Sequence, residues 1–600
     1  MAPNLLISTH CTSKSYGAQP LFTDISLQVF DNERLGLIGP NGAGKSTFLK
    51  ILADMEPADS GEISRIKNTH TIYLPQDDVL DPEKTIEVTL FHPIPKELEA
   101  WQVSKRRQEI MSLIEVDNTK QKVKTLSGGW RKRLAIGQAL FQKPDLLLMD
   151  EPTNHLDLEG ILWLEKLLKD APFAFVLVSH DRFFLENTTN RIVELNQRYP
   201  EGFLKVEGNY SVFVEKREKY THEQAKLETV LSNKVRREIE WLRRGPKART
   251  TKARYRVDKA HQLQENLEAV KGRNVQNRSV DIAFDTTHRK TKILLDAQNL
   301  RKTLGGKLLF GNLSLKLTPG IRIGVMGKNG TGKSTLMQIL NGKLAPDAGS
   351  VKVAEGLQVL TFDQKRELSE QSQTLRQALS PEGDMVIYQG RALHVIAWAK
   401  RFLFQKDQLD MPVSRLSGGE KDRVLIADLM LQPADILLLD EPANDLDIPT
   451  IEVLEESLEE FPGAIVLITH DRFLMARLCD LLLYLDGDGG AEYFADYDQW
   501  LQYRQDRLPA TSRSGETSQS PPNNKPRKLA YEERKELNRI EKQIEKAEGI
   551  ADNLQRQLHD PGIMCDADRL AQRYAEHQEA QKKVDRLYER WEELEALSRA

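Results

Sequence analysis

Two glycine-rich stretches of the sequence repeat the pattern G-x-x-x-x-G-K-S. They read GPNGAGKST, beginning at Gly39, and GKNGTGKST, beginning at Gly327. In such a pattern the glycines let backbone N–H groups curl around phosphate oxygens, the lysine neutralises the β and γ oxygens, and the serine reaches Mg²⁺. Each stretch is therefore predicted to bind the phosphates of a nucleotide. The predicted residues are Gly39, Pro40, Asn41, Gly42, Ala43, Gly44, Lys45, Ser46 and Thr47, and Gly327, Lys328, Asn329, Gly330, Thr331, Gly332, Lys333, Ser334 and Thr335.

An acidic pair ends an apolar stretch in each half of the chain. Asp150-Glu151 follows LLLM and Asp440-Glu441 follows LLLL. An aspartate at such a strand end can hold Mg²⁺, directly or through water, and the adjacent glutamate can polarise the attacking water. An acidic pair could also merely cap the following turn. The upstream phosphate loops favour the catalytic interpretation.

A histidine and a glutamine complete each set. His180 and His470 follow a further apolar run and could hydrogen-bond the γ-phosphate or the attacking water. Gln76 and Gln364 could join the shell of the metal and its water. The predicted catalytic residues are Glu151, His180, Glu441 and His470, and the predicted Mg²⁺ ligands are Ser46, Gln76 and Asp150 in one set and Ser334, Gln364 and Asp440 in the other.

These landmarks recur at a nearly constant interval. The phosphate loops and the glutamines lie 288 residues apart, and the acidic pairs, the histidines and two LSGG motifs lie 290 apart. Five landmarks in register indicate two copies of one domain. Each copy alternates apolar stretches of strand type, such as residues 35–39, with helical stretches. This alternation predicts an α/β domain with a largely parallel sheet.

The LSGG motifs, LSGGW at 126–130 and LSGGE at 416–420, place a serine and two glycines at the start of a helix, which forms an anion site. Together with the phosphate loops they resemble the ATP-binding cassette ATPases. The resemblance implies that the motif of one copy, the signature, closes on the ATP held by the other. It implies a site one with the first phosphate loop and a site two with the second. The implied signature residues are Ser127, Gly128 and Gly129 at site two and Ser417, Gly418, Gly419 and Glu420 at site one.

Three departures from the cassette pattern all fall on site two. Tyr16 stands where cassettes often stack an aromatic ring on adenine, whereas the second copy has Leu304 there. The first signature ends in Trp130, and Ala443 replaces the threonine of the first copy, Thr153. The hypothesis is that site two binds nucleotide less tightly or turns over differently. The alternative is neutral drift with both sites active.

The segment between the copies is strongly basic in a chain of formal net charge −4. From Lys234 to Lys259 eleven basic residues face three acidic ones, a local charge of +8. Pro246 disfavours helical geometry at Gly245, so two helices joined near this tip are predicted, the first of about 30 residues. A basic tip suits phosphate backbones, and a solvated helical face is the alternative. The predicted nucleic-acid contacts are Arg243, Arg244, Lys247, Arg249, Lys252, Arg254 and Arg256.

Two fused cassettes, no membrane domain and a basic helical connector resemble the ABC-F family of translation- and ribosome-associated ATPases. The resemblance implies that the connector enters the ribosome and contacts tRNA and ribosomal RNA. Within the family, the motifs EPTNHLD and NDLD and the tail resemble the Uup branch. That branch implies branched DNA as an alternative substrate.

The tail begins with a polar, proline-rich stretch that predicts a flexible tether. Apolar residues from Leu537 to Leu558 then alternate spacings of three and four, which is typical of a coiled-coil seam. Asp560-Pro561-Gly562 stops this helix, and a returning helix follows. The alternatives for this hairpin are DNA binding and a solvated intramolecular coil.

The cysteine content and the distribution of apolar residues indicate in which cellular compartment the protein is expected. The three cysteines, Cys11, Cys479 and Cys565, form no CxxC pair, which favours reduced thiols in the cytoplasm. The sequence contains no apolar run of the ~18–20 residues that a membrane span requires, and its N-terminus has no secretory pattern. We therefore expect a cytoplasmic protein, monomeric with its two cassettes paired.

The predicted architecture is α/β, with two P-loop cassettes, an α-helical connector hairpin and a C-terminal antiparallel coiled coil. The predicted activity is Mg²⁺-dependent hydrolysis of ATP coupled to action on a nucleic-acid assembly, with the ribosome first. A DNA-junction ATPase, the energising subunit of a membrane transporter and a factor that dislodges ribosome-bound antibiotics are the alternatives. The predicted domains are residues 1–214, 215–290, 291–507, 508–528 and 529–600.

Overall fold

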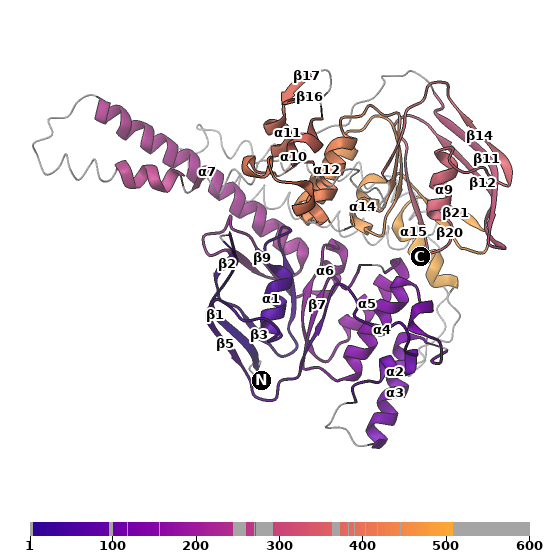
Figure 1. The fold of residues 1–600 in the computed structure, drawn as a ribbon, viewed down its shortest axis with the longest axis horizontal. Coiled ribbons are helices and arrows are strands. Elements are labelled where there is room, and N and C mark those ends of the chain that lie inside the picture. The colour runs from indigo at the N-terminus through magenta and orange to yellow at the C-terminus, as the bar shows by residue number, and fades with distance from the viewer. Residues whose placement is uncertain are drawn as a thin grey trace, which may run out of the picture. The chain divides into compact units, whose positions relative to one another are not determined.

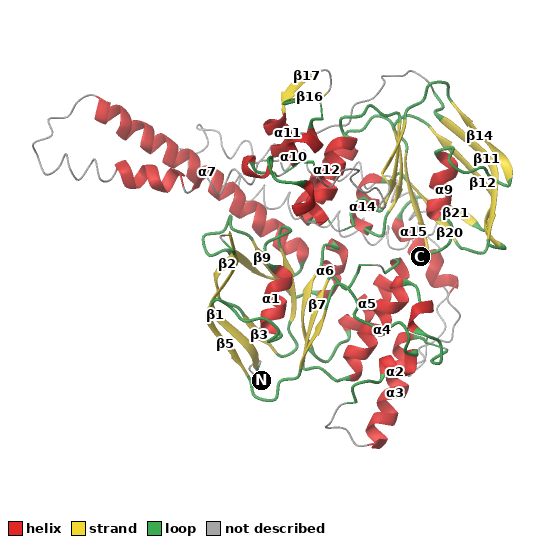
Figure 2. Cartoon of the chain, in the orientation of Figure 1, coloured by secondary structure: helices red, strands yellow, loops and turns green. Residues whose placement is uncertain are grey.

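The structure is a computed structural model in which residues up to Arg507 form one compact unit (Figures 1 and 2). The predicted tether and coiled coil, and most of the basic tip, lie outside the described residues. The structure describes residues 4–17, 19–94, 100–116, 118–154, 156–243, 260–268, 270–271, 292–362, 373–381, 383–388, 391–402, 404–416, 418–444 and 446–507.

A six-stranded sheet in the order β10-β9-β4-β8-β7-β6 forms the centre of the first cassette. Its strands run parallel except for β10, which pairs antiparallel with β9. A smaller antiparallel sheet contains β2, β1, β3 and β5. The strands are β1 (Leu5–Tyr16), β2 (Gln19–Ile25), β3 (Gln28–Phe30), β4 (Arg34–Ile38), β5 (Ser60–Arg65), β6 (Thr71–Leu74), β7 (Leu146–Asp150), β8 (Ala174–Val178), β9 (Arg191–Leu195) and β10 (Phe203–Glu207).

The second cassette repeats this topology. Its six-stranded sheet runs β21-β20-β13-β19-β18-β15, which matches the first sheet strand for strand, and again only the edge strand β21 is antiparallel. The predicted repeat and the parallel α/β fold are confirmed. The strands are β11 (Leu295–Leu304), β12 (Lys307–Leu317), β13 (Arg322–Gly327), β14 (Ala348–Val353), β15 (Val359–Phe362), β16 (Met385–Tyr388), β17 (Arg391–His394), β18 (Ile436–Asp440), β19 (Ala464–Ile468), β20 (Leu481–Leu485) and β21 (Ala491–Phe494).

The helices begin at the residues that carry the chemistry. α1 and α9 start directly after a glycine with positive φ, Gly44 and Gly332. The N-caps of α5 and α13 are Asp157 and Asp447, whose carboxylates accept a backbone N–H and satisfy an otherwise unpaired donor of the first turn. The helices are α1 (Lys45–Leu52), α2 (Ile86–Leu90), α3 (Ala100–Ile114), α4 (Gly128–Phe141), α5 (Leu158–Lys169), α6 (Arg182–Thr188), α9 (Lys333–Leu340), α10 (Leu375–Leu379), α11 (Val395–Arg401), α12 (Gly418–Leu429), α13 (Ile448–Glu459), α14 (Arg472–Leu478) and α15 (Tyr497–Arg507), with 3₁₀ turns at Val123–Thr125, Lys406–Gln408 and Val413–Arg415.

The connector begins with one long helix, α7 (Tyr210–Arg243), of 34 residues. Its first turns enter the core of the first cassette through Tyr210 and Phe213, and the helix then extends away from that cassette (Figure 1). It ends one residue before the predicted break at Arg244. Residues 260–268 and 270–271 of the returning arm are also helical. None of the helices in the described part of the chain combines the length and apolar character needed to cross a membrane.

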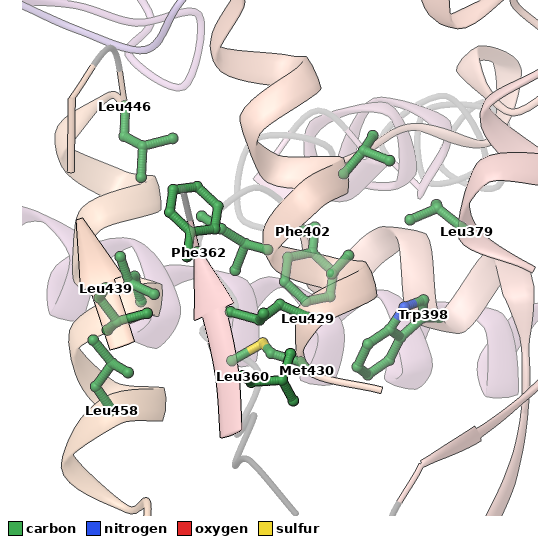
Figure 3. Close-up of a cluster of buried hydrophobic side chains, with 14 of the residues drawn as sticks. Leu360, Phe362, Leu379, Trp398, Phe402, Leu429, Met430, Leu439, Leu446 and Leu458 are labelled. Atoms are coloured by element: carbon green, nitrogen blue, oxygen red, sulfur yellow. The ribbon is translucent and has the colours of Figure 1, made fainter. Parts of the chain in front are cut away.

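A cluster of buried side chains in the second cassette joins its sheet to helices α10 to α13 (Figure 3). Trp398 of α11 is fully buried there and contacts the rings of Tyr388 and Phe402, with centroid separations of 4.9 and 5.1 Å. Leu360 and Leu439 enter the same cluster from the sheet. The helices that carry the second signature are therefore held to the sheet by apolar packing.

Removing the Trp398 ring tests this packing. Trp398→Ala is expected to lower the free energy of unfolding by about 3–5 kcal/mol, because a buried aromatic ring leaves a cavity. Urea unfolding followed by circular dichroism measures the loss. Trp101, with 63% of its surface exposed, provides the matched control, and Trp101→Ala is expected to change stability by no more than about 0.5 kcal/mol. Equal effects of the two substitutions would contradict the assignment.

Candidate active sites

The first phosphate loop follows β4 directly. Gly39 has a φ of 150°, and a Cβ atom there would lie 2.4 Å from the carbonyl oxygen of Leu195, so only glycine fits. Gly42 has a φ of 81° and faces open space, which leaves the backbone of the loop accessible to a ligand. The buried Lys45 lies across the loop and donates from Nζ to the carbonyls of Gly39 and Pro40 at 2.8 and 3.1 Å.

The second phosphate loop repeats this arrangement after β13. Nζ of Lys333 donates to the carbonyls of Gly327 and Lys328 at 2.6 and 3.1 Å. Burial lowers the pKa of Lys45 and of Lys333, and nearby carboxylates oppose the shift. The ammonium group of each lysine therefore lies against the carbonyls of its own loop and is already removed from water.

Each acidic pair meets its histidine. Nε2 of His180 lies 3.3 Å from Oε1 of Glu151, and its backbone N–H donates to Oε2 at 3.3 Å. The corresponding distances for His470 and Glu441 are 3.4 and 3.3 Å. Glu151 and Glu441 have φ values of 45° and 51°, which are unfavourable for a side chain with a Cβ atom and cluster at functional sites.

The titration of these groups follows from burial. Burial lowers the pKa of His180 and of His470 to about 3, and the charges of Lys45 and Lys333 act in the same direction. Both imidazoles are therefore neutral at pH 7, with one nitrogen that donates and one that accepts. Burial raises the pKa of Glu441 to about 8, against the opposing charge of Lys333. At pH 7 this carboxyl group is therefore mostly protonated, and only its ionised fraction can accept a proton as a general base.

The predicted metal ligands of site one fit Mg²⁺. Asp150 Oδ2 accepts a hydrogen bond from the hydroxyl of Tyr73 at 3.2 Å, and its buried Oδ1 has no hydrogen-bond partner. Within the described ranges no three His, Cys, Asp or Glu side chains form a cation cage. Mg²⁺ is usually held by one or two carboxylates together with substrate phosphates rather than by such a cage. Ser46 and Gln76 are accessible to solvent, and Gln364 lies outside the described residues.

A cavity of about 520 Å³ joins the two cassettes at site two. Lys333, Ser334, Asp440, Glu441 and His470 line it from the second cassette, and Gly128 of the first signature lines it from the other. Glu151 and His180 of site one also reach this cavity, whereas Trp130 and Tyr16 do not line it. Ser417 lies outside the described part of the second signature.

Each helix-capping aspartate also contacts the opposite phosphate loop. Asp447 Oδ2 accepts the backbone N–H of Asn41 at 2.8 Å, and Asp157 Oδ2 accepts that of Asn329 at 3.4 Å. Sequence reasoning did not single out these aspartates. Their signal was present, because both end the repeated motifs EPTNHLD and EPANDLD.

Two buried arginines cross between the cassettes close to the predicted catalytic histidines. Arg182 pairs with Glu455 of the second cassette, and Arg472 pairs with Glu165 of the first. The rings of Phe183 and Phe473 meet between them at 6.0 Å. These residues follow the histidines in SHDRFF and THDRFL, yet spacing alone did not reveal that they face each other.

The two sites differ at the predicted adenine position. Tyr16 is 57% exposed, and its hydroxyl donates to Oε1 of Glu56 at 2.5 Å. Leu304 in the second copy is 58% exposed and has no hydroxyl or aromatic face. The hydroxyl of Thr153 lies 3.3 Å from that of Ser179, an interaction that Ala443 cannot make. The ring of Trp130 lies against the guanidinium of Arg133, 5.2 Å from its centroid.

Phosphate loops, carboxylate–histidine pairs and a signature that faces the opposite phosphate loop define an ATP-binding cassette ATPase with two cassettes in one chain. A family model for ABC transporters matches residues 22–154 and 310–444, and a model for the ABC transporter C-terminal domain matches residues 528–596.

Comparison with similar proteins defines the family of this chain more narrowly. It is 32% identical to the uncharacterized ABC transporter ATP-binding protein YfmR of Bacillus subtilis, over 97% of this chain and 98% of that protein. It is 30% identical to ATP-binding protein Uup of Escherichia coli, over 99% of each, and 32% identical to the energy-dependent translational throttle protein EttA of Escherichia coli, over 82% and 94%. The chain belongs to the ABC-F family and is an ATP hydrolase.

Solved structures share the fold at lower identity. The archaeal ribosome recycling factor aABCE1, crystallised with stalk protein aP1, matches with a TM-score of 0.58 and 21% identity, over 84% of this chain and 94% of that one. The RNase-L inhibitor matches with a TM-score of 0.56 and 20% identity, over 83% and 92%. These likenesses support the arrangement of the two cassette folds.

The departures at site two predict unequal sites. Glu441→Gln leaves site one to turn over, and Glu151→Gln leaves site two. The Glu441→Gln protein is expected to retain the higher ATPase rate at low ATP, because site two lacks the aromatic platform. Steady-state ATPase assays over a range of ATP concentrations measure both, with the double variant as background. Equal residual rates would contradict the hypothesis.

Tyr16 is predicted to stack on adenine at site one. Tyr16→Ala in the Glu441→Gln protein is expected to raise the KM for ATP about tenfold, since stacking on a base contributes about 1–3 kcal/mol. Leu304→Ala, a similarly exposed position, is expected to change it less than twofold. Tyr16→Phe separates stacking from the hydrogen bond to Glu56. A loss with phenylalanine as large as with alanine would argue against stacking.

Proposed function

We propose that the chain is a ribosome-associated ATPase whose two composite sites drive the connector. The observation that carries the proposal is the root of α7, which both cassettes hold. Tyr210 and Phe213 are buried in the first cassette, and Arg217 Nη2 donates to Oε1 of Glu452 in the second at 2.7 Å. A movement between the cassettes therefore acts on the helix that leads to the basic tip.

At each site the phosphate loop holds the phosphates of ATP, and the opposite signature completes the pocket. Glu151 and Glu441 act as general bases toward the attacking water, and neutral His180 and His470 hold that water or the γ-phosphate. The serine, glutamine and aspartate of each set would hold Mg²⁺, which would neutralise charge at the phosphates. The sites are completed within one chain, so a monomer suffices.

The partner follows from charge and from the relatives. The segment with a local charge of +8 begins at Lys234 in the last turns of α7, and such a segment binds phosphate backbones by releasing counterions. EttA is by name a translational throttle, and the archaeal structural neighbour is by its description a ribosome recycling factor. Ribosomal RNA and tRNA are the proposed contacts of Arg243 to Arg256.

The proposed domains are divided after residues 214, 290, 507 and 528.

Co-sedimentation tests this function. The Glu151→Gln/Glu441→Gln protein with ATP is expected to pellet with ribosomes, because blocked hydrolysis holds the cassettes closed around ATP. Changing Arg243, Arg244, Lys247 and Arg249 to Ala is expected to abolish pelleting. Raising salt from 50 to 200 mM should weaken binding by about 10³-fold or more if six or more phosphates are contacted.

The same proteins are tested against four-way DNA junctions. Binding to junctions alone, dependent on residues 525–600, would contradict the ribosomal proposal and make the chain a DNA-binding ATPase. Pelleting that survives the loss of the basic tip would place the ribosomal contact elsewhere in the chain. Recovery only with a membrane protein would identify a transporter subunit.

A further inference from the structure

Lys132 of the first signature helix is completely buried. Its Nζ donates to the carbonyls of Gln76 and Pro75 at 2.7 and 3.3 Å and lies 2.8 Å from Oδ1 of Asp78. These three oxygen atoms all belong to residues 75–78, named here the glutamine loop. A single lysine thus holds one end of α4 to the loop that carries Gln76.

A contiguous set of contacts connects this lysine to both sites. The glutamine loop follows β6, where Tyr73 donates its hydroxyl to Asp150 of site one at 3.2 Å. On the other side, α4 begins at Gly128, which lines the cavity of site two. Lys132 lies in the second turn of the same helix. It therefore joins a loop of site one to a helix that faces site two.

Stability alone does not require a lysine at this position. A buried ion pair can be replaced by apolar side chains of similar volume with little or no loss of stability, because the charges must first be removed from water. A buried cation with three oxygen partners instead fixes the position of a loop that has no secondary structure of its own. In the sequence of the second copy the corresponding positions are Arg366 and Asp422, with the charges exchanged. Arg366 and the side chain of Asp422 lie outside the described residues.

We propose that Lys132 is a positioning residue that ties the glutamine loop of site one to the signature helix that serves site two. The inference rests on the proposed pairing of the composite sites. It assigns Lys132 no contact with nucleotide. The lysine acts through Gln76 on one side and through the start of α4, with Ser127, on the other.

A double-mutant cycle on ATP turnover tests this role. The variant Lys132→Met/Asp78→Asn removes both charges together, so that no unpaired charge is left buried. It is expected to lower kcat about tenfold or more, since a small misplacement of catalytic groups has effects of this size or larger, and to change the KM for ATP less than threefold. Added to the combined Gln76→Ala/Ser127→Ala change, which removes both groups through which Lys132 acts, it is expected to lower kcat by no more than a further twofold. A merely structural change would multiply its full loss of kcat with the losses caused by Gln76→Ala and Ser127→Ala.

Two controls accompany the cycle. Lys132→Arg keeps the charge and the donors and is expected to retain kcat within threefold. Lys124, whose Nζ lies 2.9 Å from Oε1 of Glu83 in a solvent-exposed ion pair, provides the matched lysine, and Lys124→Met is expected to leave kcat unchanged. Thermal melting verifies that each variant is folded.

The outcomes separate this inference from the function on which it rests. A Lys132→Met/Asp78→Asn protein that behaves like Lys124→Met, or whose loss multiplies with those of Gln76→Ala and Ser127→Ala, overturns the positioning role. Gln76→Ala and Ser127→Ala proteins that both keep full kcat overturn the composite sites themselves. A doubly changed protein that does not fold, beside a folded but slow Lys132→Arg, makes the lysine a folding element and likewise overturns the proposal.

Discussion

The two buried arginine–glutamate pairs that cross between the cassettes are the constraint on which the arrangement of both sites depends. Arg182 and Glu455 are each almost inaccessible to solvent. Removing the Glu455 carboxylate would cost about 3–5 kcal/mol, because Arg182 and Arg477 would both lose a buried counter-charge. Because each arginine lies two residues after a predicted catalytic histidine, this contact between the cassettes lies close to the proposed chemistry. The cassettes are thereby held where each capping aspartate reaches the opposite phosphate loop.

The two arginine–glutamate pairs occupy matching positions in the two copies, but their glutamates have different further partners. Glu455 accepts both Arg182 and Arg477, whereas Glu165 accepts Arg472 and, from its own cassette, the amide of Asn187 at 3.5 Å. An amide carries no charge, so the second cassette holds its carboxylate more firmly. A second difference between the two halves is that Leu304 of the second copy stands where the first copy has Tyr16. Duplication has therefore produced two related halves rather than two equal ones.

The sequence predicted the elements that carry contiguous motifs. The phosphate loops, the acidic pairs and the histidines fall where spacing placed them, because a strand, a turn and a helix start are local events. The contacts between Lys132 and residues 75–78, or between Arg182 and Glu455, join segments more than 50 residues apart. No periodicity encodes such a contact, since it depends on how separate elements pack. The aspartates at the ends of the EPTNHLD and EPANDLD motifs were recognisable as helix caps, but their second partners come from the other cassette.

The length of α7 converts small changes at its root into large ones at its tip. At a rise of 1.5 Å per residue its 34 residues span about 50 Å. A rotation of only about 5° at Arg217 would displace the far end, about 39 Å away, by roughly 3 Å, nearly the spacing of adjacent Cα atoms. A small movement of the cassettes would therefore be enough to move the far end of α7. Under the proposed function, the stiffness of the connector helix would determine how much of a movement between the cassettes is transmitted to the partner bound at the tip.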